Sequence, residues 1–103
     1  MEGSIYFIKQ ISTNKYYIGQ TTQDVSSRIY QHFHGTYKET DWQNLLKLYP
    51  EDFTFGILKH GIKNKNILNQ FECYYIGYYN SVENGFNKNY GGSLGPVSFL
   101  FNP

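Results

Sequence analysis

An arginine and a histidine lie four residues apart in a segment with a helical pattern. Val25, Ile29 and Phe33 recur at helical spacing and form one apolar stripe. Arg28 and His32 share a face that borders this stripe, so both side chains should emerge at the edge of the buried surface, near a sheet. Arg28 is the only arginine beside eight lysines, and its planar fork of donors suits a phosphate. A surface arginine paired with a carboxylate is the alternative interpretation.

A carboxylate lies at the margin of the apolar face predicted for the longest helix. The residues expected to form this face are Ile67, Leu68, Phe71, Tyr74, Tyr75 and Tyr78. A charge at the position of Glu72 is costly unless it is paired, binds a metal or reaches solvent past the margin. One carboxylate is too few protein ligands for structural zinc. It suits Mg²⁺, which keeps most of its waters and takes one or two carboxylates together with phosphate oxygens.

A glycine-rich segment, GFNKNYGG, contains two asparagines. Asn87 and Asn89 fit a loop for conformational reasons alone, because asparagine is frequent in turns. The functional alternative is an amide donor directed at a phosphate or at a metal ligand. The chain has no HExxH run, no P-loop and no GxGxxG fingerprint, so its motifs give little support to a nucleotide cofactor.

The composition limits the class of protein. A length of 103 residues predicts one domain, residues 1–103, and eleven tyrosines among 19% aromatic residues provide a core even in a short chain. No run of about 18 apolar residues occurs, so no membrane span is expected. The first residues do not have the pattern of a secretory signal. Cys73 is the single cysteine, which excludes an internal disulfide, and we expect a cytoplasmic protein.

Local patterns predict the elements that position these side chains. The expected strands are 4–10, 16–20 and 53–59, and the expected helices are 25–33, 41–48 and 67–79. The expected helix caps are Asp24, then Thr40 or Asp41, then Asn64 or Asn66. Gly35 and Pro50 should end the first two helices, and a turn at Gly61 should close the third strand. The chain from Asn80 is expected as loop, with a C-terminal tail over 93–103 in which 97–101 adds a short strand or packs on the surface.

This order of elements predicts an α+β fold, a small antiparallel three-stranded β-sheet flanked by helices. Short motifs in a fixed order then resemble the GIY-YIG endonuclease family. The motifs are Ser4-Ile5-Tyr6, then Tyr17-Ile18-Gly19 after ten residues, Gln20-Thr21, Arg28, His32, Glu72, Gly85-Phe86-Asn87 and Gly91-Gly92. The resemblance spans residues 4–92, with Ser4 in place of the family's glycine. Tyr-Tyr-Ile-Gly also recurs at 74–77, and only the copy at 16–19 fits the motif.

The family consists of metal-dependent endonucleases that act on phosphodiesters. The resemblance implies that Glu72 binds Mg²⁺ or Mn²⁺, and that Arg28 holds the scissile phosphate and stabilises charge in the transition state. Asn87 would support the metal and phosphate site. Hydrolysis needs a positioned water and charge neutralisation, which one cation and one arginine supply.

The resemblance places the proton-handling groups on two tyrosines and a histidine. Tyr6 and Tyr17 would lie at the active surface, with Tyr6 favoured as the base, and His32 would relay a proton or contact phosphate. A phenol has a pKa of about 10 and needs nearby cations to act as a base at neutral pH. A turn centred on Thr13-Asn14 pairs Tyr17 with Gln10, which offsets the two tyrosines by roughly 13 Å. On that register both cannot contact one water.

The expected partner is DNA, although a formal net charge of +1 is low for a DNA-binding protein. A basic cluster could face DNA, and an acidic middle segment should not. The basic cluster is Lys59, Lys63 and Lys65, and the acidic residues are Glu39, Asp41, Glu51 and Asp52. The low charge leaves a catalytically inactive nucleic-acid or protein interaction module as the alternative. A targeting partner or a homo-oligomer is also considered. The Asn-, Lys- and Ile-rich composition without alanine favours an AT-rich source such as a phage or virus.

Overall fold

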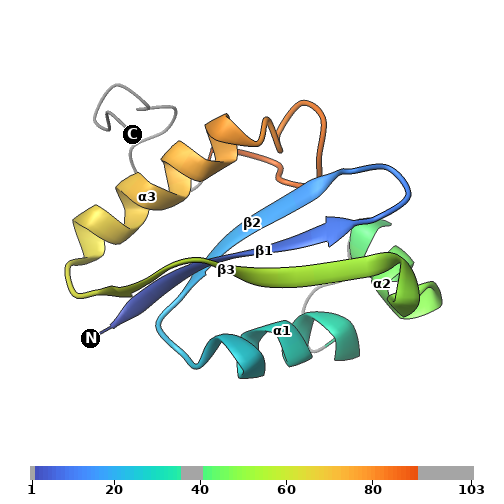
Figure 1. The fold of residues 1–103 in the computed structure, drawn as a ribbon, viewed down its shortest axis with the longest axis horizontal. Helices are drawn as coiled ribbons and strands as arrows, with labels where there is room; N and C mark the ends of the chain where they lie inside the picture. Colours follow the sequence, from blue (N-terminus) through green and yellow to red (C-terminus); the bar gives the residue numbers. More distant parts are fainter. Residues whose placement is uncertain (1, 36–40, 91–103) are drawn as a thin grey trace.

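A computed structural model of the chain describes residues 2–35 and 41–90 (Figure 1). Its elements are β1 (Gly3–Gln10), β2 (Tyr16–Thr21), α1 (Val25–His34), α2 (Asp41–Leu48), the short 3₁₀ helix η1 (Pro50–Asp52), β3 (Phe53–Ile62) and α3 (Lys65–Tyr78). The three described strands form one antiparallel sheet in the order β2-β1-β3. This arrangement confirms the predicted α+β class. The segment 97–101, expected as strand or surface tail, lies outside the described residues.

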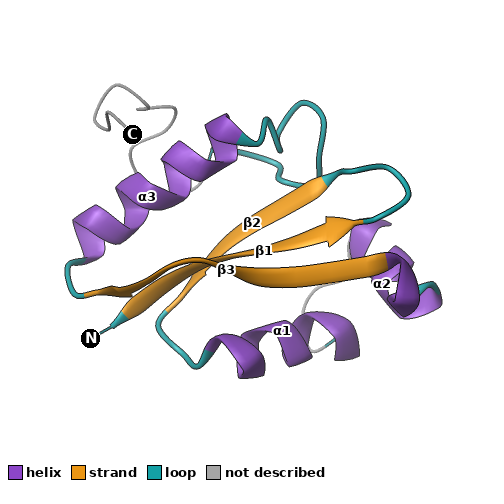
Figure 2. Cartoon of the chain, in the orientation of Figure 1, coloured by secondary structure: helices purple, strands orange, loops and turns teal. Residues whose placement is uncertain are grey.

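The alternation of side chains along the central strand separates two hydrophobic cores. Tyr6 and Ile8 point to one face of the sheet, where α1 and α2 pack, and Ile5 points to the other face, beneath α3. Figure 2 shows the sheet between these two helical layers. Among the described helices, none is both long and apolar enough to cross a membrane.

Local capping chemistry fixes the ends of two helices as predicted. The Asp24 carboxylate accepts a hydrogen bond from the Ser27 amide at the start of α1, and Gly35 ends that helix with a left-handed φ of 64°. The Asn64 side chain accepts from the Ile67 amide at the start of α3. These contacts are local in sequence, so the pattern of residues alone specifies them.

The third strand is longer than predicted. We expected it to end at Lys59 before a turn at Gly61, but β3 continues to Ile62, which pairs with Gly3. Gly61 has a left-handed φ of 71° inside the strand, and the register against β1 shifts twice in this half. A glycine that permits an irregularity within the strand has the same local signature as a glycine in a turn.

The buried face of α3 also differs from the prediction. The buried residues are Leu68, Asn69, Glu72, Cys73 and Ile76. Tyr78 was expected in the core but is 67% exposed, and Ile67 is exposed as well. The helix is therefore rotated so that Tyr78 faces outward, whereas Phe71 and Tyr75 are half-buried and stack on each other against the core beneath the helix. This rotation brings Glu72 from the expected margin into the buried face.

The register of the β1–β2 hairpin was predicted incorrectly. Gln10 pairs with Lys15 through a 2.9 Å bond from its amide, so Tyr17 lies opposite Ile8 instead of Gln10. The reason is a four-residue loop, in which the Asn14 amide donates to the Gln10 carbonyl and Asn14 adopts a left-handed φ of 59°. The loop centre shifts by one residue, and the offset between the two site tyrosines falls from four residues to two.

Candidate active site

The corrected register places two tyrosine rings side by side on the α1 face of the sheet. The ring centroids of Tyr6 and Tyr17 are 6.2 Å apart. The Tyr6 hydroxyl lies 2.7 Å from Nε2 of His32, and these two side chains are 0% and 2% exposed. The predicted distance of roughly 13 Å between the tyrosines is therefore wrong, and both phenols can address one small site.

The close approach of Tyr6 explains why the motif Tyr17-Ile18-Gly19 has glycine at its last position. Gly19 pairs with Tyr6 across the two strands, and a Cβ built at Gly19 would lie 2.5 Å from the Tyr6 hydroxyl oxygen and ring carbon. The phenol therefore crosses the strand where a side chain would block it. Any larger residue at this position would move the Tyr6 hydroxyl away from His32.

Arg28 reaches the same cluster from α1, as its predicted position at the edge of the apolar stripe requires. Its guanidinium lies close enough to the Tyr6 hydroxyl to lower the pKa of that phenol, and it donates to Oε1 of Gln31 at 3.3 Å. The side chain is half-buried, so its charge acts on its neighbours through little water. Arg28 lowers the pKa of Tyr6, Tyr17 and His32, although burial is the larger influence on each of them.

Glu72 approaches from the opposite helical layer and is held by a chain of side chains. Nε2 of Gln20 donates to Oε1 of Glu72 and to Oδ1 of Asn69, both at 2.8 Å. Nζ of Lys65 donates to Oε1 of Gln20 at 2.7 Å, which fixes the direction of that amide. Glu72 is 8% exposed and raises the pKa of Tyr17, so its charge acts on that tyrosine.

The donor set at Glu72 suits a hard cation bound mainly by water and substrate oxygens. Within residues 2–35 and 41–90, no three side chains of the His, Cys, Asp and Glu types gather as a metal cage. One carboxylate, with one oxygen hydrogen-bonded by Gln20, matches the few protein ligands that Mg²⁺ requires. The residues present therefore fit Mg²⁺ or Mn²⁺ at this carboxylate.

The side chain of Asn87 hydrogen-bonds to the backbone of β2. Its Oδ1 accepts from the Ile18 amide at 2.8 Å, and its Nδ2 donates to the Ile18 carbonyl at 2.9 Å. The Phe86 amide donates to the Tyr16 carbonyl beside it. Asn87 therefore fixes the loop to the strand that carries Tyr17, and any support it gives to a metal or phosphate acts through that strand.

Sequence reasoning missed an aromatic wall that holds the site tyrosines. Trp42 of α2 stacks on Tyr17 with a centroid distance of 4.6 Å, and it lies 5.5 Å from His32 and 5.6 Å from Phe86. The single tryptophan of the chain was the available signal. Gln20 was noted only as part of a motif, and Lys65 only as part of a basic cluster.

Burial sets the protonation of the phenols and the imidazole. Burial raises the pKa of both Tyr6 and Tyr17, and the adjacent Arg28 offsets part of this increase. Burial, with a smaller contribution from Arg28, lowers the pKa of His32 to about 4. At neutral pH the cluster thus holds two protonated phenols and a neutral imidazole that can accept or donate a hydrogen bond.

The depressed pKa of His32 predicts a loss of stability in acid. In the unfolded chain the imidazole titrates near its usual pKa of about 6.5, so the unfolded state binds more protons than the folded state below that pH. The contribution of His32 to the free energy of unfolding is complete above about pH 6.5 and disappears as the pH falls through about 4. The free energy of unfolding falls by up to about 3 kcal/mol over this range. Urea unfolding between these pH values measures it.

A comparison of two glutamine variants isolates the histidine. His32→Gln should flatten this part of the stability profile, whereas His34→Gln, an exposed position two residues away, should preserve it. An unchanged slope in His32→Gln would show that other groups cause the acid dependence.

Comparisons with known proteins identify the family and the fold. The model of the GIY-YIG catalytic domain matches residues 2–87. A mutant of the catalytic domain of intron endonuclease I-TevI is similar in structure, with a TM-score of 0.75 and 26% identity over 89% of this chain and 98% of that one. The catalytic domain of homing endonuclease I-TevI has the same fold, with a TM-score of 0.68 and 24% identity over 82% and 96% of the two chains. No curated protein matches the sequence significantly.

Proposed function

Because this chain belongs to the GIY-YIG family of nucleases, we propose that it is a metal-dependent endonuclease that hydrolyses DNA phosphodiester bonds. The observation that carries the proposal is the convergence of Arg28 and Glu72, from opposite helical layers, on Tyr17 beside Tyr6. Similarity to the intron endonuclease I-TevI supports DNA as the substrate.

Arg28 is the group that binds the scissile phosphate. Its fork of donors presents two parallel hydrogen bonds to phosphate oxygens, and its half-buried position strengthens the interaction with the charge that grows in the transition state. Lys65, which contacts Gln20 beside Glu72, adds positive charge on the same side. DNA therefore approaches along the edge of the molecule where β2 meets α3.

Tyr6 and His32 form the proton path. The neutral imidazole lies 2.7 Å from the Tyr6 hydroxyl and takes up its proton as Tyr6 receives one from the attacking water. Arg28 favours the negative charge that develops on the Tyr6 oxygen during this transfer, because its charge lowers the pKa of Tyr6. Tyr17, next to Tyr6 and facing Glu72, orients the water.

Glu72 would hold Mg²⁺ or Mn²⁺, which supplies Lewis-acid stabilisation of the leaving oxygen when bound. Gln20 holds the carboxylate in place, and Asn69 supports the Gln20 amide. The buried position excludes bulk water from one side of the carboxylate, so its charge is strongly felt at the site.

A cleavage panel tests the function. Purified protein with Mg²⁺ or Mn²⁺ is incubated with supercoiled, linear, branched and single-stranded DNA, and the ends are mapped. Cleavage that a chelator abolishes supports the proposal, and intact DNA in every case contradicts it. The low net charge favours the second candidate, an interaction module without catalysis. That candidate predicts metal-independent binding that Glu72→Gln leaves unchanged.

The tyrosines provide an internal comparison. Tyr6→Phe removes the hydroxyl that contacts His32 and should lower the cleavage rate by about 10²-fold, the usual size of a proton-transfer contribution. Tyr78→Phe removes an exposed hydroxyl on α3 and should leave the rate unchanged. Single-turnover cleavage at saturating metal measures both. Equal rates for wild type and Tyr6→Phe would remove Tyr6 from the mechanism.

A further inference from the structure

The two edge strands of the sheet differ in whether other described residues hydrogen-bond to their outer backbone. The outer edge of β2 is covered, because the Asn87 side chain and the Phe86 amide hydrogen-bond to its backbone. The opposite edge belongs to β3, and no other described strand pairs with it. In Figure 1, β3 lies nearest the viewer, with no described helix across its middle. An open row of backbone donors and acceptors is a template for another strand.

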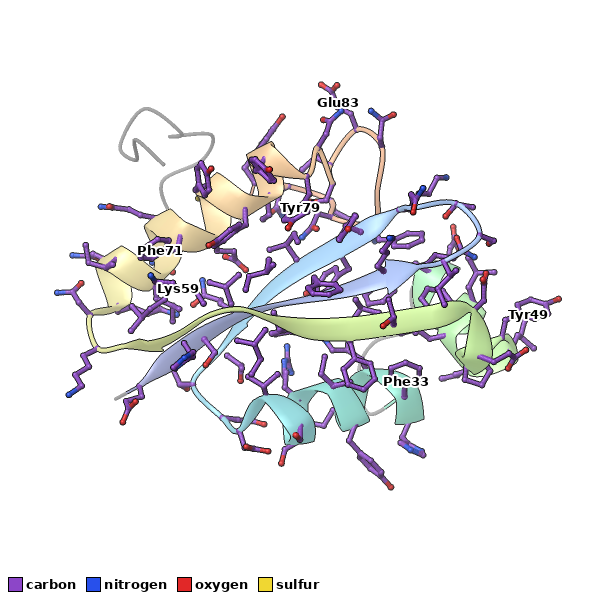
Figure 3. The ribbon with its side chains drawn as sticks, in the orientation of Figure 1. Phe33, Tyr49, Lys59, Phe71, Tyr79 and Glu83 are labelled. Carbon is purple, nitrogen blue, oxygen red and sulfur yellow. The ribbon has the colours of Figure 1, made fainter. Side chains whose placement is uncertain are left out.

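The open edge carries exposed apolar side chains. Phe55 and Ile57 of β3 are 54% and 53% exposed, and Tyr30 of α1 is exposed beside them. Phe33 rises from α1 toward this strand (Figure 3) and contacts Phe55 edge-on with a centroid distance of 6.0 Å. Tyr30, Phe33 and Phe55 line an apolar hollow of ≈ 370 Å³. Apolar residues gathered at one edge are typical of an association surface.

The pairing with β1 shows which part of the edge is regular. From Phe53 to Ile57 each residue pairs in step with β1, and the register shifts only beyond Ile57. This segment is regular enough to pair with a second strand, whereas the irregular half that follows disfavours such pairing. The available template is therefore short and centred on Phe55 and Gly56.

The charges around this segment favour an identical strand in the antiparallel direction. Glu51 and Asp52 precede the regular segment, and Lys59, His60 and Lys63 follow it. A second copy running antiparallel sets the acidic end of each strand beside the basic end of the other, whereas parallel pairing sets like charges together. A two-fold arrangement also brings each Phe55 against the Phe55–Ile57 surface of its partner, as an isologous interface requires.

We propose that two copies of this chain associate through the Phe53–Ile57 segments of their β3 edges, antiparallel about a two-fold axis, and join their sheets into one. The paired segment is short, so we expect a weak dimer that forms only at raised protein concentration. The sites near β2 then lie at the two outer ends of the joined sheet. The association does not depend on the nuclease proposal, because it uses the edge away from Arg28 and Glu72.

The unmodified protein gives the first test. Sedimentation velocity from about 1 µM to about 500 µM should show a shift from monomer to dimer. Hydrogen exchange of the Phe53–Ile57 amides should slow at the high concentration. A monomer at every concentration would overturn the proposal, as would a dimer whose added protection lies only outside this segment.

Two charge variants test the direction and place of pairing. Phe55→Glu and Ile57→Lys should each weaken the dimer at least about tenfold, and an equimolar mixture should restore it, because the new opposite charges become diagonal neighbours across the two strands. Tyr78→Glu, at an exposed aromatic of α3, is the matched control and should dimerise like wild type. Circular dichroism checks the fold of each variant. Dimers that survive both edge variants, or that only Tyr78→Glu disrupts, would refute the β3 interface.

Discussion

Replacing Glu72 with glutamine should lower DNA cleavage by about 10³-fold while the fold survives. The amide has nearly the same shape as the carboxylate, and its oxygen can still accept the hydrogen bond from Nε2 of Gln20. A neutral amide, however, is a weak ligand for a hard cation and supplies no negative charge. The change therefore removes the proposed metal site and leaves the packing beneath α3 in place.

Two measurements separate loss of the metal site from damage to the fold. Wild type should bind Mn²⁺ in a water-proton relaxation titration, and Glu72→Gln should not. The pKa of Tyr17 should fall in the variant, because the Glu72 charge raises it in the wild type. Glu83→Gln, which removes an exposed carboxylate just after α3, is the control and should keep full activity and Mn²⁺ binding. Cleavage by Glu72→Gln at the wild-type rate would contradict the assignment.

Residue types and their spacing predicted the parts of this fold that depend on contacts between residues close in sequence. Asp24, Gly35 and Asn64 act within a few residues of themselves, so their capping roles follow from residue type and spacing. The four-apart spacing of Arg28 and His32 likewise fixed their shared helical face. The family motifs then identified residues that the structure brings together from α1, α3 and the hairpin.

The errors concern choices that tertiary contacts decide. A loop with Asn14 in a left-handed conformation and a tight two-residue turn fit the same residues, yet they differ by two residues in pairing register. On α3, Tyr78 fits the predicted apolar face by residue type, but the helix buries Cys73 and Ile76 and leaves Tyr78 exposed. The stacking of Trp42 on Tyr17 joins residues from α2 and β2 that no local pattern relates.

Replacing Arg28 with alanine should lower the cleavage rate by about 10³-fold, and lysine at this position should restore only a small part of the rate. Alanine removes both the charge and the fork of donors. Lysine keeps the charge but cannot present two parallel hydrogen bonds to a phosphate. The contrast between the two variants therefore separates geometry from charge at the scissile phosphate.

The pKa of His32 reports the charge independently of activity. Arg28 helps to lower this pKa to about 4, so an NMR titration should find a higher pKa in Arg28→Ala. In Arg28→Lys it should stay low, because a cation remains nearby. A lysine variant that is nearly inactive but retains the low pKa of His32 would show that the planar fork, and not charge alone, carries the function. Full activity in Arg28→Lys would instead show that a positive charge at this position is sufficient.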